Sequence, residues 1–115
     1  MAQNFKLIKT LQNVNDTDHG KVALVELHEY NGKVFKFRFE NSNGDPCGFD
    51  YKHAASVFNK ESDEWKNLGD KRDIQAFATQ PIDYSNYYGN GARIQRDAKA
   101  FIEACKAYVV ALYGK

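Results

Sequence analysis

Two runs of alternating apolar and polar residues flank a short turn in the first half of the chain. The runs cover residues 21–30 and 33–41, and Asn31-Gly32 stands between them. Alternation with a period of two is the pattern of a half-buried strand, and Asn-Gly between two such runs is a strong hairpin signal. The pattern therefore predicts an antiparallel β-hairpin over residues 21–41.

Two loop lengths fit this hairpin, and they pair different residues. A two-residue loop sets Leu27 opposite Lys36, whereas a three-residue loop with a left-handed Gly32 in a G1 bulge sets Leu27 opposite Phe35. The longer loop gathers an apolar face from Ala23, Val25, Leu27, Phe35, Phe37 and Phe39, and leaves Glu26, His28, Lys36 and Arg38 on a polar face. Because a slip by one residue would bury charges, the pattern favours the three-residue loop.

The segments around the hairpin predict further elements. Residues 5–14 alternate imperfectly and lead into a turn rich in Asn, Asp and Gly, so they favour a strand, with a helix as the alternative. Residues 49–52 fit a short fourth strand. From about residue 50 to Gly69, apolar residues recur at helical spacing, which predicts one helix, or two if Ser62 caps the second.

The last part of the chain is predicted to be helical. Asp70 with Asp73 three residues later is typical of a helix start, and Pro81 ends that short element. Residues 92–113 then form the longest helix, with an apolar stripe made of Ile94, Ala98, Phe101, Cys105, Tyr108 and Leu112. We expect this stripe to cover the apolar face of the sheet, with Phe35, Phe37 and Phe39 packed on Phe101, Cys105 and Tyr108.

The predicted fold class is therefore α+β, in a single domain over residues 1–115. It consists of an antiparallel β-meander of three to four strands, covered on one face by a long C-terminal helix, with one or two shorter helices between. A chain of 115 residues with 43% hydrophobic residues is long enough to bury a core. No apolar run long enough for a membrane helix or a signal peptide is present, so we expect a cytoplasmic protein without a membrane partner.

The sequence carries no signature of catalysis or metal binding. The nucleophile, zinc and phosphate-loop motifs are absent, and two cysteines make no disulfide framework. A nucleophile pair of Cys47 and His53 would lack an orienting third residue. Asp16, Asp18 and His19 are typical of a turn. Cys105 falls on the apolar stripe and is expected to be an inert core thiol. We therefore predict no catalytic residue, no metal, no cofactor and no enzyme.

One loop has the composition of a binding site. Residues 82–91 combine three tyrosines with Ser, Asn and Gly, and run into the N-terminus of the last helix. Tyrosine gives rigid contact area, and a helix N-terminus with nearby arginines favours anions. The predicted ligand-binding residues are Tyr84, Tyr87, Tyr88, Asn90, Arg93 and Arg96; the alternative is that the tyrosines are simply packed against the sheet.

Two functional hypotheses follow, and both are non-enzymatic. The first is a small module that binds single-stranded nucleic acid by stacking bases on Tyr87 and Tyr88, although the net charge of only +1 gives it little support. The second is a protein-binding adaptor or inhibitor, as a monomer or a homodimer, that uses the same loop or the acidic residues 61–64. The abundance of Asn, Lys and Tyr fits a low-GC genome or a viral origin.

The hairpin carries three cations that could form a second basic strip. Lys33, Lys36 and Arg38 lie near its tip and on its polar face, but the favoured register pairs Glu29 with Lys33 and Glu26 with Lys36. Cross-strand ion pairs therefore account for two of the three cations.

Overall fold

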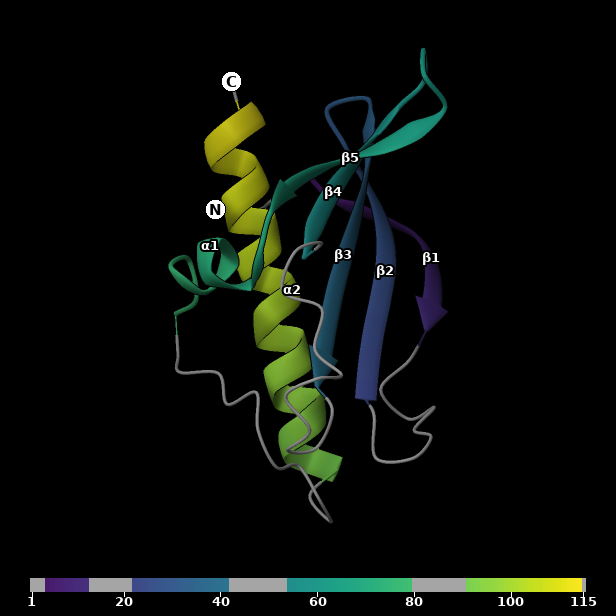
Figure 1. Ribbon diagram of the computed structural model, residues 1–115. Coiled ribbons are helices and arrows are strands. Elements are labelled where there is room, and N and C mark those ends of the chain that lie inside the picture. The colour runs from purple at the N-terminus through teal and green to yellow at the C-terminus, as the bar shows by residue number, and fades with distance from the viewer. Residues whose placement is uncertain (1–3, 13–21, 42–53, 80–90, 115) are drawn as a thin grey trace.

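The structure is a computed structural model that describes residues 4–12, 22–41, 54–79 and 91–114. These ranges form one sheet and two helices (Figure 1). The elements are β1 (Lys6–Gln12), β2 (Val22–Tyr30), β3 (Lys33–Asn41), β4 (Ala55–Asn59), β5 (Glu64–Gly69), α1 (Lys71–Gln75) and α2 (Gly91–Tyr113). The five strands are antiparallel neighbours in chain order, and α2 packs on the sheet, so the predicted fold class is confirmed.

The segment after residue 53 corrects one prediction. Residues 55–69 form the hairpin β4–β5, where the spacing had predicted one or two helices. The turn is built by Asn59, whose side-chain oxygen accepts from the amides of Glu61 (2.9 Å) and Ser62 (3.4 Å), and Asp63 has a positive φ of 57°. Ser62 therefore lies in a turn instead of capping a helix. The proposed strand over residues 49–52 lies outside the described residues.

The turn between β2 and β3 corrects the predicted register. Tyr30 pairs with Lys33, so the loop has two residues, and both Asn31 (φ 53°) and Gly32 (φ 76°) have positive φ. Positive φ at both positions is the type I′ pattern, whose twist matches that of the flanking strands. Gly32 is left-handed as predicted, but the three-residue loop with a G1 bulge is wrong.

This register changes which face of β2 meets the helix. Phe35, Phe37 and Phe39 are fully buried, and their partners on β2 are His28, Glu26 and Leu24. The predicted polar face of β2 is therefore partly buried. This register does bury the Glu26 side chain in part. The burial is tolerated because Nε2 of His28 lies 2.8 Å from Oε1 of Glu26, so the two groups form a hydrogen bond.

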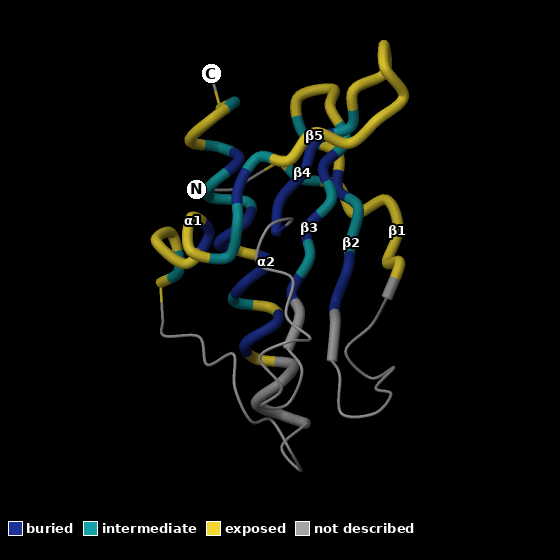
Figure 2. Tube along the Cα trace, viewed as in Figure 1, coloured by how far each residue is buried: buried dark blue, intermediate teal, exposed yellow. Residues whose placement is uncertain are grey.

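The core lies between the sheet and α2, as expected from the apolar stripe. Figure 2 shows the buried residues of α2 turned to the buried stretches of β3 and β4. The ring centroids of Phe39 and Phe101 are 5.6 Å apart, and Cys105 is fully buried with its thiol 3.9 Å from the carbonyl oxygen of Ala54. Burial, and then the negative charge of Glu26, raise the pKa of the Cys105 thiol well above its usual value, as befits a core thiol.

The short helix α1 begins at the predicted place. Asp70 and Asp73 form a capping box, because each carboxylate accepts from the other residue's amide at 3.0 Å. Just before it, the Tyr108 hydroxyl donates to the carbonyl oxygen of Leu68 (2.7 Å). A Cβ atom on Gly69 would lie only 2.8 Å from that hydroxyl, so this close approach requires glycine. Together these contacts hold the end of β5 against α2.

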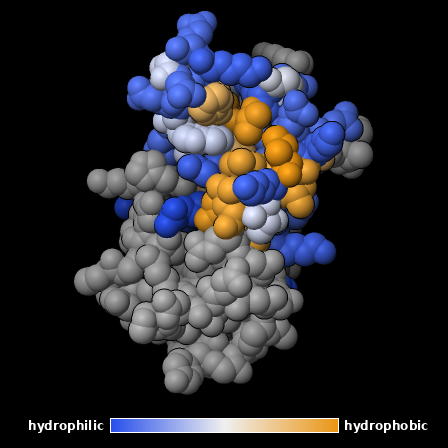
Figure 3. All heavy atoms as spheres, turned by 90° about the vertical axis from the view of Figure 1, so that its right-hand side faces the viewer, coloured by the Kyte–Doolittle hydropathy of each residue, from blue (hydrophilic) through white to orange (hydrophobic). Residues whose placement is uncertain are grey.

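The strand β1 forms one edge of the sheet and is interrupted twice. Its pairing with β2 skips Ile8 and Leu11, which are the extra residues of two bulges. Leu7, Ile8 and Leu11 are 50%, 49% and 48% exposed. Figure 3 shows hydrophobic side chains gathered on this side of the molecule, among hydrophilic ones. In the described part of the chain, no helix is long and apolar enough to cross a membrane.

Candidate binding surfaces

Most of the residues predicted from the Tyr-rich loop cannot be placed. Tyr84, Tyr87, Tyr88 and Asn90 lie outside the described residues, and so do Cys47, His53 and the turn at residues 16–19. Arg93 is in the first turns of α2, where only the backbone is described. The loop as a binding site therefore stays a prediction.

Arg96 is the one predicted binding residue whose side chain is described. It is exposed, and its Nε atom donates to Oδ1 of Asp97 at 3.3 Å. Asp97 itself is buried, so its carboxylate anchors the guanidinium close to the helix surface. This contact gives Arg96 a structural role beside any contact with a ligand.

The face of the sheet opposite to α2 is a second candidate surface, and the strand pairing defines it. Directly paired residues of antiparallel strands point to the same side, and neighbours along a strand point to opposite sides. Since Phe35 and Phe37 point to the helix, Val34, Lys36 and Arg38 point away from it. The described side chains on this helix-free face are Lys6, Lys9, Val25, Leu27, Glu29, Val34, Lys36, Arg38, Ser56, Phe58, Trp65 and Asn67.

Two aromatic residues and a lysine meet on this helix-free face. Phe58 and Trp65 are paired across β4 and β5, and their rings lie edge to face with centroids 5.3 Å apart. The Nζ atom of Lys36 lies over the Trp65 ring, 4.6 Å from its centroid. A cation at this distance is attracted by the electron-rich face of the indole. Trp65 keeps 38% of its surface exposed, so the ring has room for a further contact.

The electrostatics of this face differ from those of the whole chain. Among the described residues it carries four cationic side chains, Lys6, Lys9, Lys36 and Arg38, against the single carboxylate of Glu29. The predicted neutralisation of Lys36 by Glu26 does not occur, because Glu26 points to the opposite face and bonds to His28. In the described part of the chain no carboxylate pairs with Lys36. The chain's net charge of +1 therefore hides a locally basic surface.

The aromatic pair escaped the sequence analysis for a definable reason. Trp65 and Phe58 were both assigned to the apolar stripe of a helix, so they were expected in the core. A turn centred on residues 60–63 would have placed them opposite each other on two strands. The signal was present in the Asn, Ser and Asp residues of that turn, which favour turns through side-chain bonds to the backbone.

The pair of His28 and Glu26 lies beside an aromatic contact. The ring centroids of His28 and Phe5 are 6.2 Å apart, and the Phe5 ring stacks on Tyr30 with centroids 4.4 Å apart. In the described residues no three His, Cys, Asp or Glu side chains come together in a way that could hold a metal ion.

Comparison of the chain with protein-family models, with curated proteins and with solved structures finds no match.

Proposed function

We propose that this chain is a non-enzymatic module that binds single-stranded nucleic acid across the helix-free face of its sheet. The observation that carries the proposal is the cluster of Lys36, Trp65 and Phe58, in which a cation and two aromatic rings meet on one face, Trp65 exposed and the other two half-buried. Proteins that bind single strands combine aromatic rings, on which bases stack, with cations that follow the phosphates.

The charge of the face supports the same ligand. Residues that face one another across successive strands form rows that cross the sheet. One row runs from Lys6 on β1 to Trp65 on β5, and the next begins at Lys9 and passes through Lys36. A strand laid along these rows meets cations at several points, and Glu29 is the one carboxylate among their described residues. This arrangement removes the main objection to a nucleic-acid ligand, which was the near-neutral net charge.

The Tyr-rich loop remains a second candidate surface for the same ligand. The loop precedes α2, and the helix runs from Gly91 at one end of the sheet to Tyr113 at the other (Figure 1). We propose the helix-free face as the principal surface, because its aromatic and basic side chains contact one another.

Replacement of Trp65 tests the proposal. We expect Trp65→Ala to weaken binding of a fluorescein-labelled oligo(dT) by about 5- to 150-fold, since a stacked base contributes about 1–3 kcal/mol. Phe77→Ala is the matched control, because Phe77 has the same 38% exposure and one aromatic partner, Tyr108, away from this face. Equal affinities of the two variants, measured by fluorescence anisotropy, would refute the proposal.

The dependence on salt gives a second measurement in the same experiment. If three or four of the cations contact phosphates, log K should fall with log[salt] with a slope of about −2 to −3 for a single strand. A slope near zero would show that the ligand is not held through its phosphates.

A second candidate function is a protein-binding adaptor, favoured by β1. Leu7, Ile8 and Leu11 make an apolar patch on an edge strand, and such patches commonly mark contacts between proteins. Lys6 and Lys9 on the same strand would repel each other if two copies joined edge to edge, so this patch suits another protein better than a homodimer. The acidic residues 61–64, also proposed for this role, are exposed in the β4–β5 turn.

A further inference from the structure

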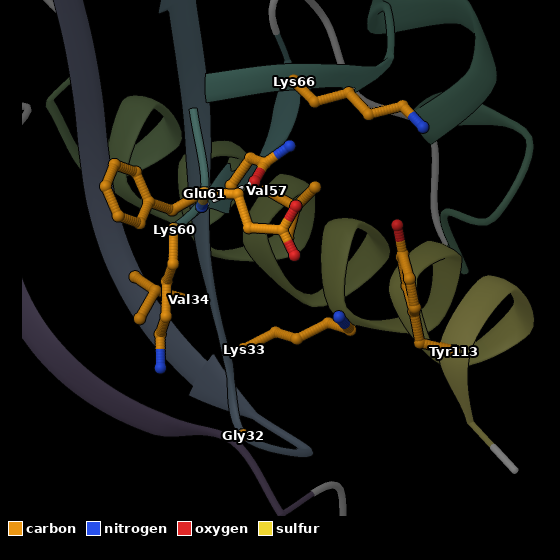
Figure 4. A pocket seen from close by; sticks show the side chains of 10 residues that line it. Gly32, Lys33, Val34, Val57, Lys60, Glu61, Lys66 and Tyr113 are labelled. Atoms are coloured by element: carbon orange, nitrogen blue, oxygen red, sulfur yellow. Dashed lines mark hydrogen bonds between the residues drawn. The ribbon is translucent and has the colours of Figure 1, made fainter. Parts of the chain in front are cut away.

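A cleft of about 510 Å³ lies where the two hairpin turns approach the C-terminal end of α2 (Figure 4). Lys33 comes from the β2–β3 hairpin, Lys60 and Glu61 from the β4–β5 turn, Lys66 from β5 and Tyr113 from the helix. The volume is in the range of small-molecule sites, and larger than a single phosphate needs. Val34 and Phe58, which lie on the helix-free face, also line the cleft, so the two surfaces adjoin.

The fold fixes the walls of this cleft. The side-chain amide of Asn31 donates to the carbonyl oxygen of Tyr113 at 3.0 Å, which ties the hairpin tip to the last turn of α2. The Nζ atom of Lys33 lies 5.8 Å from the centre of the Tyr113 ring. In Figure 4 the side chains of Lys33 and Lys66 both extend towards the side where Tyr113 stands, and the Glu61 carboxylate points into the space between them.

The charges of the cleft are not balanced within the described chain. Two ammonium groups, those of Lys33 and Lys66, extend to the side where the Glu61 carboxylate points, whereas the Lys60 side chain points away from it (Figure 4). No described carboxylate forms an ion pair with these lysines. The C-terminal end of α2 adds roughly half a negative charge. α2 has no basic residue in its own last turn. The two ammonium groups of Lys33 and Lys66 therefore exceed the Glu61 carboxylate and the helix end together by a small positive charge.

We propose that this cleft binds a small anion that carries two or more phosphate groups, at a site that adjoins the nucleic-acid surface at Phe58. The two ammonium groups of Lys33 and Lys66 would donate to phosphate oxygens from different walls, and the Tyr113 hydroxyl would donate a third bond. A diphosphate spans such walls, whereas one phosphate does not use the available volume. Because the Glu61 carboxylate faces the same space, it repels the anion, and its removal should tighten binding.

Calorimetric titration of the full chain with inorganic pyrophosphate tests this proposal. We expect the double variant Lys33→Gln/Lys66→Gln to bind at least about tenfold more weakly, because each lost charge-assisted bond is a substantial part of the affinity. We expect Glu61→Gln to bind more tightly. Lys9→Gln/Lys36→Gln is the matched control, because it removes two lysines from the helix-free face and should leave pyrophosphate binding within about twofold.

Two further measurements keep the result interpretable. A melting curve shows whether the cleft variant is folded, and Lys33→Arg/Lys66→Arg should recover most of the binding because it keeps both charges. Absence of binding to the unaltered chain, or equal weakening by both lysine pairs, would overturn the proposal, since the latter means attraction to net charge alone. The nucleic-acid proposal fails separately, through Trp65→Ala and oligo(dT), so the two outcomes are distinguishable.

Discussion

The polar pair on the helix side of β2 is the least expected feature at the scale of single residues. The side chains of His28 and Glu26 are only 5% and 18% exposed, and they are bonded to each other. The second ring nitrogen of His28, Nδ1, has no hydrogen-bond partner in the described part of the chain. The bond to Glu26 is therefore the principal compensation for burying this imidazole.

Removal of the carboxylate should reveal this dependence. We expect Glu26→Ala to lower the free energy of unfolding by about 1–3 kcal/mol, because it leaves a second buried ring nitrogen of His28 without a partner. Glu29→Ala is the matched control, since Glu29 is an exposed residue on the same strand and its loss should cost less than about 1 kcal/mol. Urea denaturation measures both. Similar values would mean that Glu26 faces solvent, as the three-residue loop had predicted.

At the scale of elements, the sequence predicted what local patterns determine. The alternating phenylalanines of β3, the stripe of α2 and the capping box at Asp70 each lie within one segment, and all three were recognised. These patterns suffice for the fold class, because a sheet with one apolar face and a helix with one apolar stripe have few ways to pack.

What the sequence did not predict depends on partners distant in the chain. In β4, Val57 packs against the core and the next residue, Phe58, lies on the opposite face of the sheet. Apolar residues on both faces do not alternate with polar ones, so the segment fits either a strand or a helix. The hairpin register likewise depended on whether Glu26 could be buried, which the bond to His28 decides. The Trp65 surface was missed through the first of these errors. The Tyr-rich loop lies outside the described residues and stays a prediction.

The turn residue Asn31 tests the corrected register. In the type I′ turn Asn31 must adopt a positive φ, which Asn and Gly tolerate and alanine does not, whereas the three-residue loop would keep this position right-handed. We therefore expect Asn31→Ala to lower the free energy of unfolding by about 1–2 kcal/mol more than Asn31→Gly. Both variants lose the bond to Tyr113, so their difference in thermal or urea denaturation isolates the backbone term. An equally stable pair would contradict the two-residue turn.

At the scale of the whole molecule, the lysine cleft and the residues that begin α2 lie at opposite ends of this helix. Asn31 and the lysine cleft adjoin Tyr113, and Arg93 lies twenty residues earlier, which is about 30 Å along a helix. This separation is several times the distance of about 8 Å over which exposed charges act at physiological salt. A charge change at one end should therefore leave a ligand at the other end undisturbed.

Charge reversal on the helix-free face and at the N-terminal end of α2 decides which of the two binds nucleic acid. With an oligonucleotide too short to span both, we expect Lys36→Glu to weaken binding by at least about tenfold, because it replaces a phosphate-attracting cation beside Trp65 with a repelling carboxylate. Arg93→Glu should change the affinity by less than about twofold. It should also preserve the fold, because an acidic side chain near a helix N-terminus is favourable by about 0.3–1 kcal/mol.

If Arg93→Glu and Tyr87→Ala/Tyr88→Ala abolish binding while Lys36→Glu does not, the ligand belongs to the Tyr-rich loop. The helix-free face would then have only a structural role, and Lys36 would serve to shield Trp65 from water.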